Sequence, residues 1–436
     1  MFYHLLPLLS LSLLAVLFAA PLDGEPKKWA LLIAGSNGYY NYRHQADVSH
    51  AYQILRKRGI PAENIVTMMF DDVANDPENP CPGKLFNGPD LKDVYQGIKI
   101  DYRSQDVNKD VFLNVMKGNK AGVQGVGNGR VLESGPDDHV FIYYTDHGAA
   151  GLVAMPVGDV LTKEDLWDAL NDMYKNNRYS KLVFYMEACE SGSMFDGYPA
   201  DRNLYAVTAS NGEESSWAVY CSVKSFPCLG DEFSVNWMHD TETKGTHVES
   251  LEAQYEDAKE ATKQSHVCKF GDFEFNSENI GDFQGDRCEE TQEEDRFEEP
   301  KTGWAVQDVY LRELEKKIRL ADNVLEREIL LRALNLAKQN RDRVAQLFWS
   351  IAHRLLGSSP LFADVVSVRP KSISDMGCHS KVAHFFDRSC LRFSENPYAL
   401  HHAFILANLC DQIKSPQKII AAMAFECADL DLKNVH

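Results

Sequence analysis

The sequence predicts an α/β fold with a parallel-rich sheet flanked by helices, followed by an all-helical C-terminal region. Three observations support this prediction. Apolar runs of strand length alternate with helical patterns over roughly the first 270 residues. An acidic segment with a single apolar residue interrupts this alternation near residue 289. Beyond that segment, apolar residues recur at helical spacing, and no strand-like alternation competes.

Five apolar runs, each followed by small or polar residues, are expected to form the strands: residues 29–34, 65–70, 139–145, 181–187 and 204–209. Helical patterns fall between them at residues 46–58, where Gly59 is a stop signal, and at residues 163–175. A helix between two strands lets them run parallel, because parallel neighbours need a crossover connection. Residues 71–89 are rich in Asp, Asn and Pro, so we expect a surface loop there.

Two of the predicted strands end next to residues that can carry chemistry. The run over residues 181–187 leads into Cys189, and the run over residues 139–145 leads into His147. The carboxyl ends of neighbouring parallel strands line one crevice, so this thiol and this imidazole can meet as nucleophile and base. A lone Cys is more often a small buried hydrophobe. A Gly follows each residue within three positions, which leaves room for backbone N–H groups to face a substrate oxyanion and favours catalysis.

Length and composition limit the remaining possibilities. A chain of 436 residues indicates two domains, or one large domain with extensions, and 44% hydrophobic residues can form a substantial core. The net charge of -19 argues against nucleic acid or an anionic membrane as a partner.

The N-terminal residues 1–20 are apolar apart from His4 and scattered Ser, lack acidic side chains and precede a polar segment, so they are expected to be a secretory signal peptide. An uncleaved membrane anchor is the alternative. It is disfavoured because the run is short for a membrane span and contains Pro7. No later stretch of the sequence is long and apolar enough to cross a bilayer.

The ten cysteines fit an oxidising route through the secretory pathway. Without Cys189 nine remain, so at least one more is unpaired, and Cys81 in its Pro-rich loop is the expected one. Two pairs are close enough in sequence for disulfides: Cys221 with Cys228, and Cys268 with Cys288. The other four lie near the C-terminus, where the sequence alone leaves three connectivities open: Cys378, Cys390, Cys410 and Cys427.

The acidic segment divides the chain into parts of different charge. Residues 289–300 contain seven acidic side chains and are expected to be a linker, within a longer linker and activation segment over residues 289–323. In the region after it, residues 324–436, 14 Lys and Arg stand against 11 Asp and Glu, a net charge of +3 that leaves -22 for the rest. Opposite charges favour docking of the two parts. One helical face there is apolar: Val344, Leu347, Phe348, Ile351 and Leu355.

Three motifs are long enough to be specific: Glu187-Ala188-Cys189-Glu190-Ser191-Gly192-Ser193, Tyr144-Thr145-Asp146-His147-Gly148, and Ala34-Gly35-Ser36-Asn37-Gly38 with Asn41-Tyr42-Arg43-His44-Gln45-Ala46-Asp47. They closely resemble the legumains, or asparaginyl endopeptidases, a family of caspase-like cysteine proteases. The resemblance extends over nearly the whole chain from Lys27 onward. It implies a caspase-like catalytic domain at residues 27–288 and a death-domain-like helical prodomain at residues 324–436. It also implies the disulfides Cys378 to Cys410 and Cys390 to Cys427.

The resemblance assigns a role to each catalytic residue. Cys189 would attack the peptide carbonyl, and His147 would take the thiol proton and give it to the leaving amine. The backbone N–H groups of Gly148 and Cys189 would face the oxyanion. Asn41 would orient the imidazole through its amide, although an Asn in a Tyr-Asn-Tyr turn could simply hold the loop.

The same match places Arg43, Glu187 and Asp231 in the pocket for the side chain that precedes the cut. The residues expected to line it are His44, Ser215 and Ser216. The carboxylates can accept from the NH2 of an Asn carboxamide while Arg43 donates to its oxygen. An Asp substrate would be repelled at neutral pH. For Arg43, the alternative is a solvated surface ion pair.

The resemblance implies an endopeptidase that cuts after Asn, and after Asp at acid pH, made as a zymogen and activated by acid self-cleavage. Cleavage is expected at Asn323, which would lie over the active site; the alternative is an ordinary N-cap for the next helix. Two other functions remain open. The same acyl-enzyme could serve a peptide asparaginyl ligase, in which an amine replaces water. The chain could also be a silent binding module, although the intact Cys189, His147 and Asn41 argue against that.

The expected partners are protein and peptide substrates, the chain's own C-terminal prodomain as inhibitor, and cystatin-type inhibitors. Nucleic acid, a membrane span, a cofactor and a metal are not expected. The expected location is the secretory pathway, leading to a lysosomal or vacuolar compartment or to secretion, for example into a gut lumen.

Overall fold

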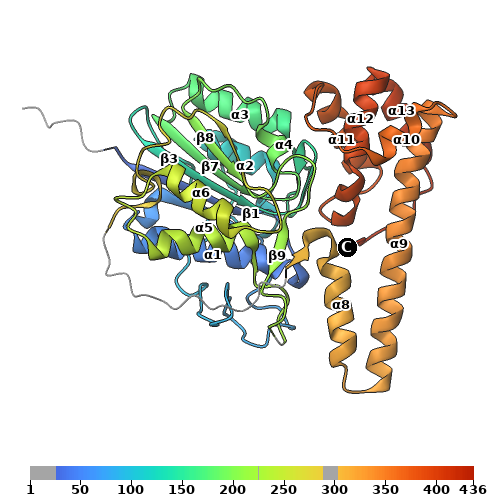
Figure 1. Ribbon diagram of the computed structural model, residues 1–436, viewed down its shortest axis with the longest axis horizontal. Helices are drawn as coiled ribbons and strands as arrows, with labels where there is room; N and C mark the ends of the chain where they lie inside the picture. The colour runs from blue at the N-terminus through green and yellow to red at the C-terminus, as the bar shows by residue number, and fades with distance from the viewer. Residues whose placement is uncertain (1–25, 224, 288–302) are drawn as a thin grey trace, which may run out of the picture.

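The computed structural model describes residues 26–223, 225–287 and 303–436. The expected signal peptide at residues 1–20 and the acidic linker at residues 289–300 lie outside the described residues. Figure 1 shows two parts side by side, a sheet with its covering helices and a set of C-terminal helices. We call them the α/β part, residues 26–287, and the helical part, residues 309–436.

A six-stranded sheet with the order β11-β8-β7-β3-β1-β2 forms the centre of the α/β part. Its strands are β1 (Lys28–Ala34), β2 (Ile65–Met68), β3 (His139–Thr145), β7 (Lys181–Glu187), β8 (Leu204–Thr208) and β11 (Cys268–Gly271). The first five run parallel, which confirms the five predicted strands and the parallel-rich sheet. β11 runs antiparallel at the edge of the sheet and has no fully buried residue, so it lacks the apolar run that predicts a strand.

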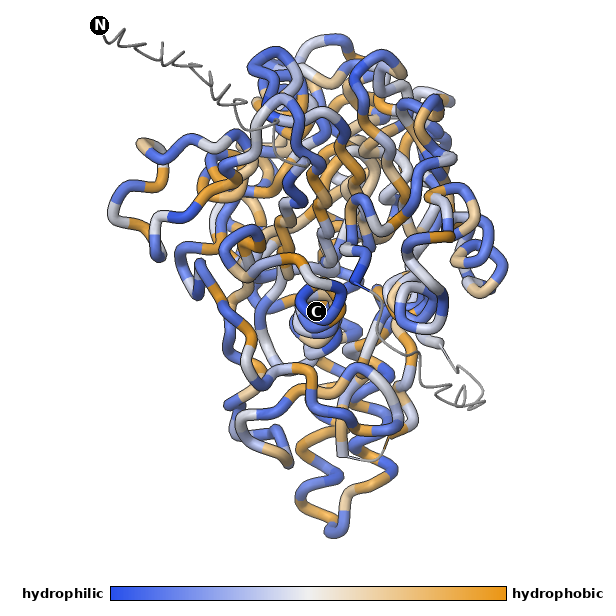
Figure 2. The backbone as a smooth tube through the Cα atoms, turned by 90° about the vertical axis from the view of Figure 1, so that its left-hand side faces the viewer, coloured by the Kyte–Doolittle hydropathy of each residue, from blue (hydrophilic) through white to orange (hydrophobic). Residues whose placement is uncertain are grey.

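Helices cover both faces of this sheet. Leu31 and Ile33 of β1 face the core under α2 (Lys109–Met116) and α3 (Lys163–Lys175). Ala30 and Leu32, which point the other way, face α1, α5 and α6. These three helices span Tyr42–Lys57, Glu232–Thr243 and Leu251–Ala261. The tube in Figure 2 is hydrophobic along the central strands, as burial on both faces requires.

Shorter elements connect this frame. They are the α-helices α4 (Gly192–Phe195) and α7 (Gly281–Gln284), and the 3₁₀ helices Tyr39–Asn41, Ala62–Asn64, Ser104–Asp106 and Lys120–Val123. One small sheet consists of β4 (Gly148–Ala149), β5 (Leu152–Val153) and β6 (Leu161–Thr162). A second consists of β10 (Gly230–Asp231), β9 (Trp217–Val219) and β12 (Trp304–Ala305).

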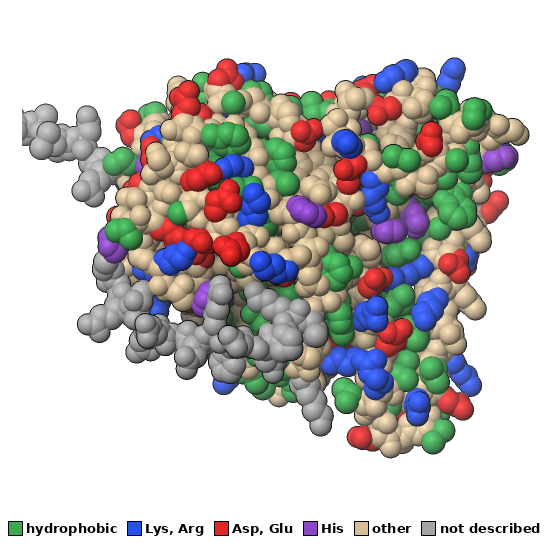
Figure 3. Space-filling model, viewed as in Figure 1, with side chains coloured by type: hydrophobic (Ala, Val, Ile, Leu, Met, Phe, Trp, Pro, Cys, Tyr) green, Lys and Arg blue, Asp and Glu red, His purple; other side chains and the backbone are tan. Residues whose placement is uncertain are grey.

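The segment over residues 289–323 is structured in its second half. β12 is followed by a 3₁₀ helix, Val306–Asp308, and by α8, Val309–Leu320. α8 and the start of the long helix α9 (Val324–Leu356) form a hairpin, seen at the bottom of Figure 1. Figure 3 shows Lys and Arg side chains over this hairpin.

The rest of the helical part packs around the second half of α9. Its elements are α10 (Leu361–Ser367), α11 (Met376–Ser389), a 3₁₀ helix (Pro397–His402), α12 (Phe404–Ile413) and α13 (Pro416–Glu426). The predicted apolar face of α9 lies in this core, with only Leu355 partly exposed. The all-helical prediction for this region is therefore confirmed.

Within the described residues three disulfides are present: Cys378 to Cys410, Cys390 to Cys427, and Cys221 to Cys228. The expected pairing of the C-terminal cysteines is thus confirmed, as is the small loop at residues 221–228. Among the described residues Cys81, Cys189 and Cys268 are free, and Cys288 lies outside them.

The two parts share an apolar contact. Small apolar residues of the α/β part belong to the same buried cluster as the helical core: Ala149, Ala150, Leu152, Ala154 and Val160. At the rim, Arg388 and Arg392 pair with Asp159, and His384 Nε2 lies 2.9 Å from Asp165 Oδ2. No described helix has the length and apolar character needed to cross a bilayer.

Candidate active site

The register of β3 and β7 brings the two candidate strand ends together. Thr145 lies opposite Glu187, and the backbone N–H of Asp146 donates to Glu187 O at 3.0 Å. The chain then passes so closely that a Cβ added at Gly148 would lie 2.3 Å from Cys189 O. Only Gly fits at position 148. Because β3 and β7 end side by side, His147 and Cys189 follow these strands at one edge of the sheet.

Asn41 determines which nitrogen of His147 is available. Asn41 Nδ2 donates to Asn37 O at 2.9 Å, which orients the amide so that its oxygen faces His147 Nε2 at 2.8 Å. An amide oxygen only accepts, so Nε2 carries the proton and Nδ1 keeps a free lone pair. The pKa of His147 lies well below its ordinary value because of burial and the nearby Arg43 charge. The imidazole is therefore neutral.

Cys189 is 6% exposed, and its Sγ lies 3.3 Å from Ser215 Oγ and 3.7 Å from Ser216 Oγ. Burial and the neighbouring Glu190 carboxylate raise the pKa of the thiol to about 11, although both hydroxyls act in the opposite direction. Both partners are thus neutral with the helical part in place. A thiolate requires a more polar or more open site than this one.

Glu190 follows the thiol in a strained conformation. Its φ of 49° lies in the left-handed region, and its N–H donates to Glu214 O at 2.8 Å. Its carboxylate pairs with Arg369, which lies in the loop between α10 and α11. Burial raises the pKa of Glu190 to about 8, and the Arg369 charge opposes this rise. The helical part therefore makes an ion pair one residue from Cys189.

Glu187, two residues before Cys189, belongs to a cluster of buried polar side chains that we call the pocket. Arg43 Nε donates to Asp231 Oδ1 at 2.8 Å, and Glu187 Oε2 accepts from the Ser234 N–H at 3.0 Å and its hydroxyl at 2.9 Å. The two Nη atoms of Arg43, Glu187 Oε1 and Asp231 Oδ2 have no hydrogen-bond partner among the described residues. Buried donors and acceptors left unpaired in this way can be satisfied by a polar ligand.

The pocket holds more acid than base. Burial and mutual repulsion raise the pKa values of Glu187 and Asp47 well above their ordinary range, and burial raises that of Asp231 against the opposing Arg43 charge. Asp47 accepts from Asn87 Nδ2 at 2.6 Å. The sequence alone assigned no role to Asp47, although it stands in the Asn41 to Asp47 motif.

His44 lies between the pocket and the catalytic pair. Its Nδ1 lies 2.6 Å from Ser36 Oγ, and its ring centroid lies 5.2 Å from that of His147. His44, Asp146 and His147 each offer a possible metal ligand atom, all within 4.8 Å of one another. The Arg43 charge, which lowers the pKa of both histidines, also opposes a cation there.

A second acidic group could hold a cation in principle: Asp240, Glu249 and Asp257. Lys244 Nζ already lies 3.0 Å from Asp240 Oδ1 and 3.2 Å from Glu249 Oε1, and it also contacts Asp257. The Lys244 ammonium thus occupies the position among these carboxylates that a cation would take.

Comparisons with known proteins agree with this geometry. The Peptidase C13 family model matches residues 28–286, and the model "Legumain, prodomain" matches residues 332–427. The chain is 38% identical to Legumain of Homo sapiens over 423 residues, which cover 96% of each chain. It is 39% identical to the Vacuolar-processing enzyme delta-isozyme of Arabidopsis thaliana over 92% of this chain and 90% of that one. This chain belongs to the legumain family.

It is therefore a cysteine endopeptidase of the legumain type that carries its own prodomain. The chain is also 39% identical to Hemoglobinase of Schistosoma mansoni, over 88% of each chain. Among solved structures, Caspase-1 of Spodoptera frugiperda matches with a TM-score of 0.35 and 9% identity, over 60% of this chain and 91% of that one.

Three further segments outside the α/β part lie against this legumain-type site. Val306 N–H donates to Ser216 O at 3.1 Å where β12 meets β9. The His436 ring lies between Tyr40 and Tyr310, with centroids 4.5 Å and 5.0 Å away, and its charge would lower the pKa of His147. In the loop after α10, Lys371 O would lie 3.2 Å from a Cβ added at Gly212.

Asn323 does not lie over the site, contrary to the expectation from the resemblance. It is exposed at the turn between α8 and α9, where Oδ1 accepts from the Glu326 N–H at 2.8 Å as the N-cap of α9. Figure 1 shows this turn at the end of the hairpin, away from the sheet. The helix preceding Asn323 carries the chain away from Cys189, which residue spacing alone could not reveal.

Several residues near the site were not predicted from the sequence. They are Glu190, Arg369, Trp304, Val306 and His436. The sequence did contain a signal for Glu190, because it is a charged residue directly after the candidate nucleophile. The other four lie far from Cys189 in sequence, and no local pattern connects them with it.

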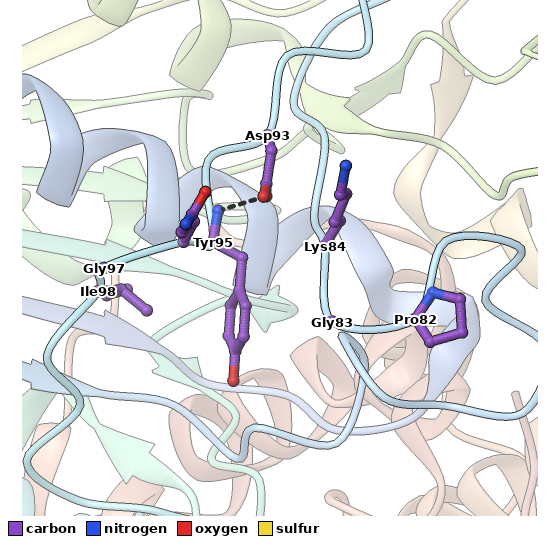
Figure 4. A pocket seen from close by; sticks show the side chains of 8 residues that line it. Pro82, Gly83, Lys84, Asp93, Tyr95, Gly97 and Ile98 are labelled. Carbon is purple, nitrogen blue, oxygen red and sulfur yellow. Dashed lines mark hydrogen bonds between the residues drawn. The ribbon is translucent and has the colours of Figure 1, made fainter.

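A separate hollow of about 450 Å³ lies on the loop that follows Cys81, as Figure 4 shows. Lys84, Asp93 and Tyr95 are among the residues that line it. Asp93 Oδ1 accepts from the Tyr95 N–H at 3.0 Å and so helps to hold the loop itself. We assign this hollow no catalytic role.

Proposed function

We propose that this legumain-type protease cleaves peptide bonds after Asn. The observation that carries the proposal is the buried pocket in which Arg43 supplies donors and Glu187 and Asp231 supply acceptors. An Asn carboxamide has one acceptor and two donors, so it can satisfy both sides of the pocket. An apolar side chain would leave these groups unpaired, which is costly in a buried site.

The same pocket discriminates against a substrate carboxylate. A carboxylate would add a charge beside Glu187, Asp231 and Asp47, with Arg43 as the pairing cation. Once protonated, Asp has a donor and an acceptor end and approximates the shape of Asn. Cleavage after Asp therefore requires a pH near the ordinary Asp pKa of about 3.9.

The proposed chemistry uses Cys189 and His147. His147 Nδ1 takes the thiol proton, and Sγ attacks the peptide carbonyl carbon to form a tetrahedral oxyanion. The backbone N–H groups of Gly148 and Cys189 stabilise that oxyanion. The C–N bond breaks, His147 protonates the leaving amine, and water activated by the same imidazole hydrolyses the thioester. Asn41 keeps the Nε2 proton in place throughout.

The prodomain is proposed to inhibit in two ways: the chain occupies the edge of β9, and the Cys189 thiol is buried. β12 takes up the edge of β9 beside Ser216, and Arg369 pairs with Glu190 next to the nucleophile. Burial also keeps the Cys189 thiol neutral, with its pKa raised to about 11. Detachment of β12, together with removal of the helical part, would open this edge to water and to substrate.

Acid release is proposed to depend on buried histidines. Burial lowers the pKa values of four histidines of the helical part. The pKa is about 3 for His401 and about 4 for each of the other three, His379, His402 and His436. Because the released form binds these protons more readily, docking weakens as pH falls from about 6.5. Glu190 has the opposite sign, since its raised pKa favours the docked form as pH falls through 8. Histidine protonation, rather than loss of this carboxylate charge, then drives release.

Cleavage at Asn323 remains part of the proposal, but as cleavage by a second molecule. An exposed turn suits proteolysis, and its place at the end of the hairpin favours attack in trans. Dependence on histidine charge fits an acidic lysosomal or vacuolar compartment, and one relative is named for vacuolar processing.

The test measures kcat/KM for three peptides that differ only in Asn, Asp or Gln before the bond, from pH 4 to pH 7, with acid-treated protein. We expect Asn to be cut throughout and Asp only near pH 4. Arg43→Gln should abolish both activities. Arg130→Gln, which removes an Arg–Asp pair at 2.7 Å outside the pocket, is the matched control. Efficient cleavage after Asp at pH 7 would contradict the proposed pocket, and products joined to an added amine would indicate ligation.

A further inference from the structure

The segment before α8 is paired with the α/β part as a strand. β12 lies antiparallel to β9, with Trp304 opposite Ala218 and Ala305 opposite Trp217. β10 pairs with the other edge of β9. The edge of β9 that β12 occupies is thus the edge that becomes free when β12 detaches from it.

The direction of β12 is that of a substrate. Its chain runs towards Ser216, whose Oγ lies 3.7 Å from Cys189 Sγ, and Val306 N–H donates to Ser216 O. A peptide running towards the nucleophile in this way can add to the same edge by main-chain hydrogen bonds. In such a peptide, the residue opposite Ser216 directly precedes the scissile bond. The residue opposite Ala218 is then the third residue before the scissile bond.

The side chain at this third position points onto an apolar surface. Residues directly opposite each other in an antiparallel pair share one face, so Trp304 lies on the Ala218 side. There it packs on a buried cluster formed by Ala218, Cys221, Cys228 and Val309. Val309 belongs to α8, which follows β12 closely in the chain, and it is withdrawn when β12 and α8 detach. Ala218 and the Cys221 to Cys228 disulfide remain.

The disulfide loop is held in place by the α/β part itself. The Phe226 ring lies 6.1 Å from the Tyr42 ring and 5.5 Å from the Phe86 ring, in edge-to-face arrangements. α8 adds a contact from the other side, where Lys316 Nζ donates to Cys221 O at 3.0 Å. Because the aromatic contacts lie within the α/β part, the surface is preformed after α8 has gone.

We propose that Ala218 and the Cys221 to Cys228 disulfide form a specificity subsite that takes a large apolar, preferably aromatic, side chain three residues before the cut. The preferred substrates are peptides with an aromatic residue two positions ahead of Asn. Trp304 is the chain's own occupant of this subsite in the zymogen. The inference rests on the proposed function, since it adds a second selected position to the same cleavage.

The test compares three peptides on the activated, unmutated protease: Trp-Ala-Asn, Ser-Ala-Asn and Ala-Trp-Asn, each before the same leaving group. We expect kcat/KM to be about tenfold higher for Trp-Ala-Asn than for Ser-Ala-Asn, because apolar burial discriminates at about this level. Ala-Trp-Asn is the control for a general effect of Trp, and it should resemble Ser-Ala-Asn. Equal rates for all three would refute the subsite and leave Asn cleavage standing. Failure to cut any of them would refute the proposed function instead.

Two variants locate the effect. Ala218→Leu should reduce the preference for Trp-Ala-Asn to about twofold or less while the Ser-Ala-Asn peptide is still cut, because the larger side chain fills the subsite. In the zymogen, Trp304→Ala should raise labelling of Cys189 by a thiol reagent at pH 7 several-fold. Trp349→Ala, which changes an exposed Trp of α9, is the matched control. An unchanged preference in Ala218→Leu, or equal labelling of the two Trp variants, would overturn the assignment.

Discussion

The α/β part and the helical part bury charge for different purposes. The α/β part encloses ionisable groups in one pocket: Arg43, Asp47, Asp146, Glu187 and Asp231. The helical part instead buries histidines and pairs its arginines with carboxylates of the α/β part. We propose that the first arrangement recognises a substrate and that the second responds to pH. Inhibition follows because the responsive part covers the recognising one.

The two parts also differ in how they are held together. The sheet depends on register between strands distant in sequence, such as β1 with β3 and β3 with β7. The helical part is stapled by two disulfides that close segments separated by 32 and 37 residues. Chemical changes directed at one part should therefore separate the two parts experimentally.

The first prediction removes the chemistry and leaves both parts folded. Cys189→Ser should lower peptide hydrolysis by about 1,000-fold or more, because an alcohol is far less ionised than a thiol. The unfolding midpoint should not change. Cys268→Ser, which alters another free thiol, is the control. Activity within tenfold of the unmutated protease would refute the nucleophile assignment.

The second prediction breaks the helical part alone. Replacing Cys378 and Cys410 by Ser should destabilise the helical part by about 3 to 4 kcal/mol, because it frees the unfolded chain of a long loop. Denaturant melts followed by hydrogen exchange should show the loss in α11 and α12, with the central sheet little changed. Equal loss of protection in both parts would show that they unfold as one unit.

The third prediction concerns the ion pair beside the nucleophile. Arg369→Ala should weaken docking of the helical part by about 2 to 3 kcal/mol, because it leaves the buried Glu190 without its partner. Part of this loss is recovered as Glu190 takes up a proton. The measurement is the rate of Cys189 labelling in the zymogen above pH 8, where Glu190, whose pKa is raised to about 8, carries its charge. Lys371→Ala, in the same loop, is the control, and equal rates in the two variants would contradict the prediction.

The fourth prediction tests the pH response of the helical part. Burial lowers the pKa of His379 to about 4, and the His384 and Lys163 charges act in the same direction. The contribution of neutral His379 to docking is thus complete above about pH 6.5 and is lost as the pH falls to about 4. His379→Gln should move the release midpoint down by about half a pH unit, since one of four such groups is gone. His353→Gln, on the exposed side of α9, should not move it.

The smallest effect is expected at Asn323. Asn323→Ala should slow or redirect the loss of the C-terminal region at about pH 4, near the ordinary carboxyl pKa values. Loss of the N-cap should destabilise α9 by only about 1 kcal/mol. Intact mass analysis gives the fragments, and Asn335→Ala in the same helix is the control. Because attack is expected in trans, the rate should rise with protein concentration; identical fragments and rates in variant and unmutated protein would exclude this site.

Much of the α/β frame could be predicted from sequence because each strand has its own apolar run. The ends of two such runs already placed Cys189 and His147 at one edge, and β3 and β7 pair as that prediction required. The family motifs added Asn41 and Arg43, which lie against His147 and Asp231. Local patterning suffices here because parallel strands bring their ends together by topology alone.

Tertiary structure alone decided how the helical part meets the site. The pairing of β12 with β9 involves two residues and has no periodic signal. Arg369 reaches Glu190 across 179 positions, and Asn323 is carried away from Cys189 by the course of α8. Contacts of this kind depend on the packing of whole elements against one another, and no run of neighbouring residues encodes them. The sequence by itself thus determined the chemistry of this protease, and the packing of its helical part decided when that chemistry is covered.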